Sequence, residues 1–285
     1  MIKLTINTKR KLLGLLTLFS LATTALAVTP YDGVASNGDT IRLVDLGLPS
    51  GTLWADRNIG ADCPADTGNY YAWGETEQKK FYTWGTYMCT TSDECGTTYD
   101  PVFAALGNNP DISGTLFDAA TVIWGNNYRM PTLAQIDELN NASLTTWTWT
   151  VQTDKQGHSM NGYLVTSKSN GNSIFLPASG YMDNAYLDGF GTEGSYRSAM
   201  RCNDLKYQAY VLYFNHSASK HNSMYGSRFA GRVIRPVSVQ AATNVNEFSA
   251  QVVIPSCESK KTLRDGHLFI TLPNGNTYHL NGSKK

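Results

Sequence analysis

The clearest local pattern along the chain is a short amphipathic helix that follows Pro131. Its apolar positions recur at helical spacing, and an N-cap with the spacing of a capping box stands before them. These positions are Leu133, Ile136 and Leu139 (apolar), Thr132 (N-cap) and Gln135 (capping box). We expect this helix to end at the paired asparagines 140 and 141. A second short helix is expected over Asp118–Trp124, because Gly125 follows it.

Most other apolar segments are short and alternate with polar residues, which is the pattern of β-strands. Asn170-Gly171 separates two of them and indicates a hairpin turn. The expected strands are Thr40–Leu46, Thr52–Ile59, Trp147–Val151, Gly162–Ser167, Ser173–Pro177, Tyr207–Asn215 and Gly231–Val237. Segment 68–74 is expected to be a strand or a tight turn, and segment 88–115 is expected to be irregular. Two short helices among many strands predict an α+β fold with an antiparallel sheet.

The N-terminal apolar segment has the features of a secretory signal peptide. Basic side chains precede an apolar run over Leu12–Leu21, and Ala25-Leu26-Ala27 is a small-x-small cleavage site. The apolar stretch 12–27 is short for a membrane helix, which needs about 20 residues. We therefore expect cleavage after Ala27, no membrane span in the mature chain, and a secreted or cell-surface location. An uncleaved anchor is the alternative.

The rest of the chain divides by composition. Residues 28–39 are polar and are interpreted as a leader, residues 40–238 as one domain, and residues 239–259 as a linker. Residues 260–285 are interpreted as a C-terminal β-hairpin tail, because His267–Leu272 and Asn276–Leu280 flank Pro273-Asn274-Gly275. A lone hairpin is marginal in water, so the tail is expected to dock on another surface or to serve as a signal.

Composition and charge exclude several classes of protein. Only 16% of the residues are charged, against roughly 25% in an average globular protein, which argues against a coiled coil. Without residues 1–27 the chain holds 19 basic and 23 acidic side chains, a net charge of −4. The body 28–258 alone holds 14 basic and 22 acidic side chains, a net charge of −8. An acidic body argues against a nucleic-acid partner, because nucleic-acid binding needs a basic face.

The cysteines and histidines show no metal-binding spacing. Five cysteines are present, all after residue 27. Cys89 and Cys95 lie six residues apart in a polar segment and are the candidate disulfide, while at least one cysteine is left unpaired. There is no CxxC motif and the five histidines are scattered, so no metal and no cofactor is expected.

Five ordered blocks resemble the Fibrobacter succinogenes major paralogous domain family, which is found in secreted proteins of Bacteroidota and Fibrobacter. The blocks are VDLGLPSGTLWADRNIGA (44–61), DTGNYYAWGET (66–76), WGNNYRMPTLAQIDEL (124–139), NGNSIFLPASGY (170–181) and GRVIRPV (231–237). The resemblance implies a C-type-lectin-like fold, distantly similar to formylglycine-generating-enzyme domains. The tail 262–282 resembles a C-terminal hairpin that is appended to secreted Bacteroidales proteins.

Within this resemblance, one set of residues is expected to form the scaffold. Arg129 would be a buried or half-buried fork donor to carbonyls or to a carboxylate, and Arg232 would close the final strand against the first. The full structural set is Trp54, Trp73, Trp124, Arg129, Pro131, Arg232 and Arg235.

No enzymatic motif is present in the sequence. Asp137 and Glu138 are adjacent on a helix and face different directions, which is poor geometry for a glycosidase pair. The EPN, QPD and WND tripeptides of calcium-dependent lectins do not occur, and Cys202 is the single cysteine in the C-terminal half of the domain. An activity like that of the formylglycine-generating enzyme is therefore the weakest alternative.

The remaining candidate for function is a surface rich in Tyr, Asn, Ser and Gly. Segments 180–196 and 215–229 have the composition of adaptable binding loops, and we expect both to be exposed, on one face. The candidate ligand-binding residues are Tyr181, Tyr186, Tyr196, Arg197, Asn215, His216, His221, Tyr225 and Arg228. The expected function is a non-catalytic module that binds an extracellular glycan or protein. The alternatives are a structural component of the cell envelope and, for these segments, turn-rich connections without a ligand.

Overall fold

The computed structural model describes residues 31–88, 101–217, 220–238, 260–264, 267–271 and 277–279. The predicted signal peptide, the predicted Cys89–Cys95 disulfide and the predicted linker 239–259 lie outside the described residues. Contacts divide the chain into two compact units, Met1–Ala242 and Thr243–Lys285.

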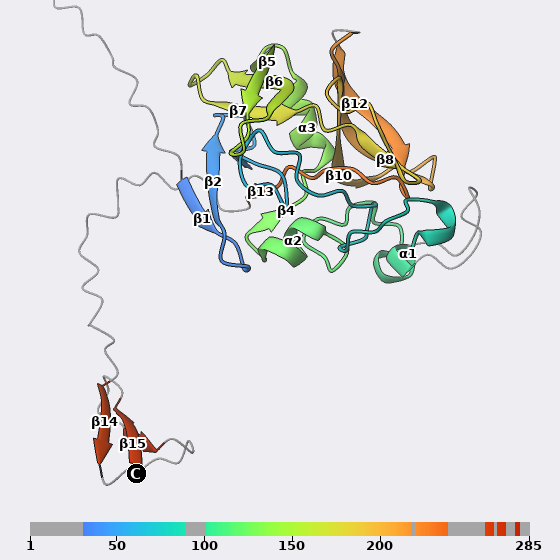
Figure 1. The fold of residues 1–285 in the computed structure, drawn as a ribbon. Helices are drawn as coiled ribbons and strands as arrows, with labels where there is room; N and C mark the ends of the chain where they lie inside the picture. Colours follow the sequence, from blue (N-terminus) through green and yellow to red (C-terminus); the bar gives the residue numbers. More distant parts are fainter. Residues whose placement is uncertain are drawn as a thin grey trace, which may run out of the picture. The chain divides into compact units, whose positions relative to one another are not determined.

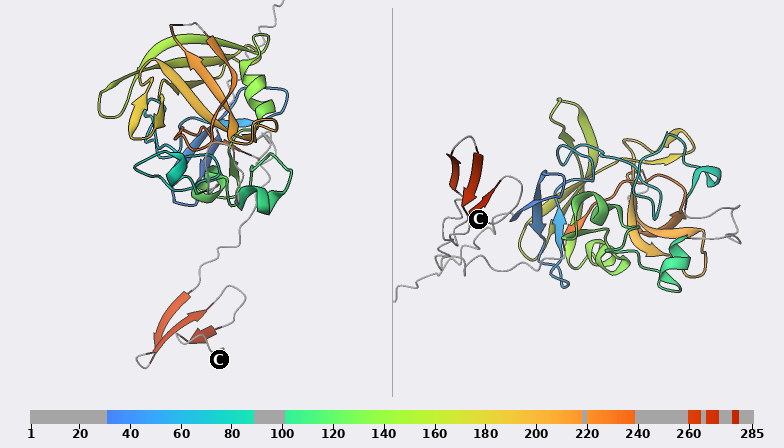
Figure 2. Two further views of the ribbon diagram at one scale, coloured as in Figure 1. Left: turned by 90° about the vertical axis from the view of Figure 1, so that its right-hand side faces the viewer. Right: turned by 90° about the horizontal axis from the view of Figure 1, so that it is seen from below.

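The first unit is built mostly from antiparallel strands with three α-helices in its described part (Figures 1 and 2), in agreement with the expected α+β class. The helices are α1 (Pro101–Leu106), α2 (Ala119–Trp124) and α3 (Leu133–Asn140), with a short 3₁₀ turn at Trp84–Thr86. The first strands are β1 (Tyr31–Val34), β2 (Thr40–Asp45), β3 (Leu53–Ala55), β4 (Tyr128–Arg129), β5 (Thr145–Thr153), β6 (Ser159–Ser167) and β7 (Ser173–Pro177). The remaining strands are β8 (Tyr181–Asp183), β9 (Tyr186–Asp188), β10 (Glu193–Arg201), β11 (Gln208–Asn215), β12 (Lys220–Ser227) and β13 (Val237–Ser238).

Both predicted helices are confirmed, and so is the predicted capping box of α3, whereas α1 lies in the segment 88–115 that was expected to be irregular. Thr132 accepts a hydrogen bond from the Gln135 amide while the Gln135 side chain accepts one from the Thr132 amide, so the capping box is complete. The Asp118 carboxylate caps α2 by accepting hydrogen bonds from two amides of the first turn. Burial raises the pKa of this carboxyl group, and its hydrogen bonds from backbone amides act in the opposite direction.

The strands form four antiparallel sheets in this unit. They have the orders β1-β2-β3-β13-β4, β5-β6-β7, β8-β9 and β10-β11-β12. Residues 31–34, which the sequence analysis places in a leader, form β1 and pair with β2. The closing strand is shorter than expected over 231–237, because β13 pairs with β3 and β4 only at Val237 and Ser238. Arg232 does not close that sheet: its backbone pairs with Tyr71 instead.

Two clusters of buried side chains hold these sheets together. One contains Trp73 and Trp124 and lies among β1 to β4 and α2. The other contains Trp54 and fills the space between β5-β6-β7, α3 and β10-β11-β12. All three tryptophans are buried, as predicted for large aromatic residues in a domain with few charges.

The arginines of the scaffold differ in how well they are satisfied. Arg235 is buried and donates to Asn58 and to the carbonyls of Ala55, Asp56 and Phe175, so its guanidinium joins the segment after β3 to β7. Arg129 is half-buried beside Gly114, and its Nε has no hydrogen-bond partner among the described residues.

The expected role of Arg129 as a fork donor therefore stays a prediction. Pro131 is buried as expected of a scaffold residue, and its carbonyl accepts a hydrogen bond from Ala199 on β10.

The second unit contains three described strands: β14 (Lys260–Arg264), β15 (His267–Thr271) and β16 (Thr277–His279). They form one antiparallel sheet in the order β14-β15-β16. Two of these strands match the hairpin predicted from the sequence. β14 adds a third strand, because residues 260–264 pair with β15 along their whole length.

Candidate functional site

The two segments singled out in the sequence are mostly strands, not loops. Segment 180–196 forms the β8-β9 hairpin and the start of β10, and segment 215–229 forms the end of β11 and most of β12. β10, β11 and β12 pair with one another, so the segments do lie together in space (Figure 1). β8 joins this group through two bridges, Gly180 with Gly194 and Met182 with Gly231.

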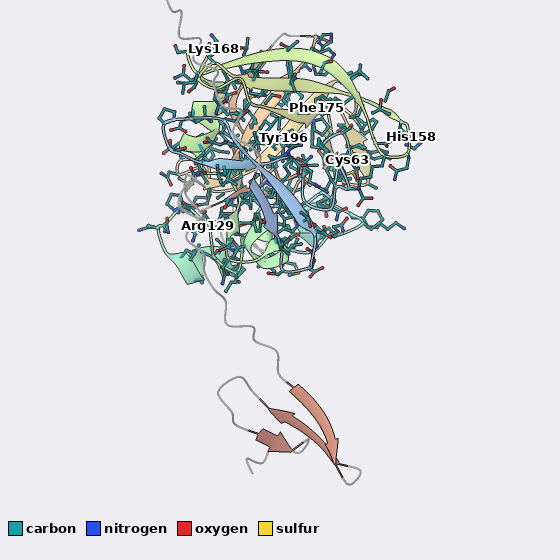
Figure 3. The ribbon with its side chains drawn as sticks, turned by 90° about the vertical axis from the view of Figure 1, so that its left-hand side faces the viewer. Cys63, Arg129, His158, Lys168, Phe175 and Tyr196 are labelled. Carbon is teal, nitrogen blue, oxygen red and sulfur yellow. The ribbon has the colours of Figure 1, made fainter. Side chains whose placement is uncertain are left out.

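Three of the candidate binding residues are core residues, so the expectation that they are exposed is wrong. Tyr196 lies in the interior of the first unit (Figure 3). It is 1% exposed, and its hydroxyl donates to the Pro177 carbonyl at 2.6 Å. Burial raises the pKa of Tyr196 to about 12. The alternation along β10 turns this ring toward Leu212 and Phe214, because the three share one face of the sheet.

Arg197 and Arg228 are buried for a different reason: they hold the turn between β12 and the segment that follows it. Arg197 donates through Nη2 to the carbonyls of Ser227, Arg228 and Ala230. Arg228 donates to the Tyr87 hydroxyl at 2.9 Å, and its guanidinium lies 4.6 Å from the ring of Trp73. Burial and the neighbouring Arg232 and Arg228 lower the pKa of Arg197. These arginines fix the backbone and do not face a ligand.

The remaining candidates do not share one face, which corrects a second expectation. Tyr225 pairs with Tyr210, and their rings lie 5.4 Å apart on the face that also carries Leu212 and Phe214. Asn215 alternates to the opposite face. The register also separates Tyr225 from the Asn215 end by five residues, about 17 Å along the strand.

Two histidines, one directly after β11 and one on β12, stack on tryptophans of β5. His221 stacks on Trp147 at 4.2 Å and His216 stacks on Trp149 at 4.3 Å, with interplanar angles of 4° and 13°. His221 also contacts the Asn140 side chain of α3 at 3.2 Å. Burial lowers the pKa of His221. These stacks attach the β11-β12 sheet to β5, and His216 keeps an exposed edge.

The opposite face of the β10-β11-β12 sheet lies near Tyr181 of β8. Tyr181 lies 5.0 Å from the Arg232 guanidinium, which donates to Ser195 of β10 at 2.7 Å. Glu193 on the same face accepts a hydrogen bond from Asn215 at 2.6 Å. Burial raises the pKa of Tyr181, and the carboxylates of Asp188, Asp183 and Glu193 act in the same direction while Arg232 opposes them. Three carboxylates therefore lie close enough to Tyr181 to act on its hydroxyl group.

Three exposed apolar residues lie on the β8-β9 hairpin or directly after it. Tyr186 is 73% exposed, Phe190 52% and Leu187 41%. We call these three residues the hairpin patch. Tyr186 was predicted from the sequence, but Leu187 and Phe190 were missed. An aliphatic residue and a phenylalanine in a segment rich in Gly and Asp were the available signal.

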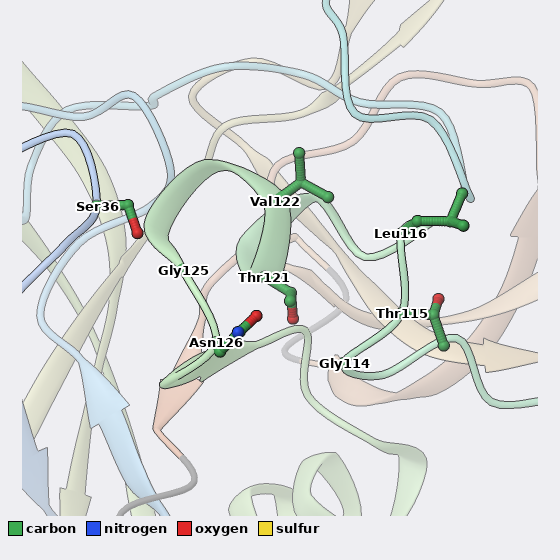
Figure 4. A pocket seen from close by; sticks show the side chains of 8 residues that line it. All are labelled: Ser36, Gly114, Thr115, Leu116, Thr121, Val122, Gly125 and Asn126. Atoms are coloured by element: carbon green, nitrogen blue, oxygen red, sulfur yellow. The ribbon is translucent and has the colours of Figure 1, made fainter.

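A separate hollow lies beside α2 (Figure 4). It has a volume of about 420 Å³, and its lining includes Ser36, Thr115, Thr121 and Asn126. The Thr121 hydroxyl is already engaged with Asp118 and with the Tyr128 carbonyl. The hollow is wide open and holds no ionisable side chain, which makes it a poor candidate for catalysis.

The structure offers no metal centre within the residues it describes, because no three His, Cys, Asp or Glu side chains gather there. The carboxylates of α3 are engaged in structural hydrogen bonds: Glu138 accepts from Ser50 and Asp137 from Ser223. Cys63 and Cys202 are free thiols, the first half-buried and the second buried. None of the helices in the described ranges has the length and apolar character to cross a membrane.

Comparison with known proteins gives no relative. No family model, no curated protein and no solved structure matches the chain.

Proposed function

We propose that the chain is an exported, non-catalytic binding module on a C-type-lectin-like scaffold, with the β8-β9 hairpin as its ligand-binding element. The resemblance of the five sequence blocks supports the scaffold, and the mixture of antiparallel sheets with a capped α3 is compatible with it. The observation that carries the function is the hairpin patch. Large apolar side chains that are left exposed on an ordered element are typical of interaction sites.

The hairpin is held firmly enough to present these side chains. Met182 exchanges two backbone hydrogen bonds with Gly231, of 2.7 and 2.9 Å. Asn184 takes a left-handed conformation with φ of 54° in the turn, and its backbone exchanges hydrogen bonds with the backbone of Tyr82. A patch on such a support loses little conformational entropy on binding, which favours affinity.

The test is binding of the mature chain, residues 28–285, to a glycan array and to a protein array. The variant Tyr186→Ser/Phe190→Ser removes the aromatic part of the patch from exposed positions, so the fold should be unaffected. We expect a bound ligand to lose at least tenfold in affinity. The matched control is Tyr225→Ser, because this tyrosine is also exposed (53%) but lies on the other face of the three-stranded sheet. Equal loss in both variants contradicts the assignment to the hairpin.

A structural role in the cell envelope is the second candidate, and the compact unit at residues 243–285 favours it. Deletion of residues 243–285 separates the two functions. An envelope component anchored through this unit loses its cell association on deletion, whereas a binding module keeps its ligand affinity.

A further inference from the structure

The outer edge of β9 offers backbone hydrogen-bonding groups that the hairpin itself does not use. In the pair β8-β9, Met182 lies opposite Leu187. Met182 directs its amide and carbonyl away from β9, toward Gly231. When a residue in an antiparallel pair points its amide and carbonyl away from the partner strand, the residue opposite it does the same. Leu187 therefore directs its amide and carbonyl to the free edge of β9, and no described residue bonds with them there.

The side chains around this edge are apolar and acidic. Tyr186 and Asp188 project to one face of β9 and Leu187 to the other, and all three are exposed. Residues 181–196 include three carboxylates, Asp183, Asp188 and Glu193, and no Lys or Arg.

Two cations lie near the hairpin. Arg232 is buried and bonded to Ser195 and Ser227. Lys80 is exposed and lies over the ring of Phe81, two residues before Tyr82, whose backbone pairs with Asn184. The accessible charge of β9 itself is negative.

The shape of the hairpin favours a peptide over a sugar. Residues 184–188 are exposed one after another, so the element is convex. Sites for small molecules are concave and bury most of the ligand. A free strand edge is instead completed by another extended chain, whose main chain supplies affinity and whose alternate side chains supply specificity.

We propose that the free edge of β9 pairs with an extended segment of a partner protein in which basic and apolar residues alternate. This inference rests on the proposed binding function and names its ligand class. The basic residues of the segment meet Asp188 and Tyr186 on one face, and the apolar residues meet Leu187 on the other. β9 is only three residues long, a length that protects an edge from indiscriminate pairing, so the charges are needed to select the partner.

The probe is a nine-residue synthetic peptide in which Lys alternates with Val, titrated against the mature chain at low salt. Two N-methylated versions carry the methyl groups on alternate residues, one on the odd and one on the even positions. Alternate amides of a strand point to opposite edges, so only one version loses the bond to Leu187. We expect that version to bind about three- to tenfold more weakly than the other. Replacement of Lys by Glu in the peptide should reduce affinity by at least tenfold at low salt, and high salt should narrow this difference.

Protein variants locate the peptide. Leu187→Ser and Asp188→Asn should each weaken binding several-fold, whereas Leu116→Ser, at a still more exposed aliphatic position beside α2, should not change it. An equal response to both N-methylated peptides, or equal binding of the Lys and Glu peptides, overturns the inference. Absence of peptide binding overturns it as well. The proposed function is tested separately: it is wrong if Tyr186→Ser/Phe190→Ser weakens binding to no glycan and no protein on the arrays.

Discussion

Replacement of Tyr196 distinguishes a core residue from a binding residue. The ring is buried against Phe214 between two sheets, and its hydroxyl donates to the Pro177 carbonyl. Tyr196→Phe removes that hydrogen bond and should lower the free energy of unfolding by about 0.5–1.5 kcal/mol. The lower half of this range applies, because the Ser179 amide still satisfies the same carbonyl. Tyr196→Ala leaves a cavity as well and should cost about 3–5 kcal/mol.

The assay is urea unfolding of the mature chain, followed by tryptophan fluorescence. Both variants should shift the midpoint at an unchanged slope, because the surface exposed on unfolding is the same. Tyr225→Ala is the matched control, since this exposed tyrosine contacts only part of Tyr210, and its cost should stay below about 1 kcal/mol. A Tyr196→Ala protein that unfolds like the wild type would refute the assignment of this side chain to the core.

Three further changes test other contacts. Burial lowers the pKa of His221 below its ordinary 6.5, so the unfolded chain binds the proton first. This contribution to stability is present above about pH 6.5 and is lost as the pH falls below that value. The wild type should therefore have a lower unfolding midpoint at about pH 5.5 than at about pH 7.5, and His221→Phe should reduce this difference. Arg235→Lys loses a guanidinium with four acceptors and should destabilise by about 3 kcal/mol or more in the same assay, whereas a loss under 1 kcal/mol contradicts a structural role. Gly180→Ala places a Cβ against the Asp188 carbonyl at φ of 61°, so proteolysis within 181–190 should accelerate while the rest of the chain stays protected.

Local signals predicted α2, α3 and several of the paired strands, but not α1. The capping box at Thr132 and the aspartate before α2 depend on residues within four positions of one another, so the sequence specifies them without the tertiary structure. The strand Ser173–Pro177 and the turn glycine Gly171, with φ of 76°, follow from the same short-range pattern.

The strands of the binding region could not be predicted in this way. β10 and β12 are rich in Ser, Gly, Asn and Arg, and they lack the alternation of apolar residues that marks a half-buried strand. The polar residues of β10 are mostly buried, because arginines and serines of distant segments satisfy one another, as in the bond of 2.7 Å between Arg232 and Ser195. Such pairing depends on tertiary contacts, so composition alone suggested exposed loops.

The same arginines explain why a region with the composition of a binding loop contains so few accessible binding residues. Arg197, Arg228 and Arg232 are buried close together, and each donates to backbone carbonyls of segments 206–230 or to neighbouring hydroxyl groups. A guanidinium can satisfy several carbonyls at once, so irregular backbone between β12 and β13 can be buried without regular strand pairing. Tyrosines on the inner side of this framework, such as Tyr196, are then needed as core. Tyr186, which lies beyond its edge on β9, is left largely uncovered by the described residues. Replacement of Tyr186 should therefore lower ligand affinity without lowering the free energy of unfolding. Binding and unfolding measured on the same variant will test this difference.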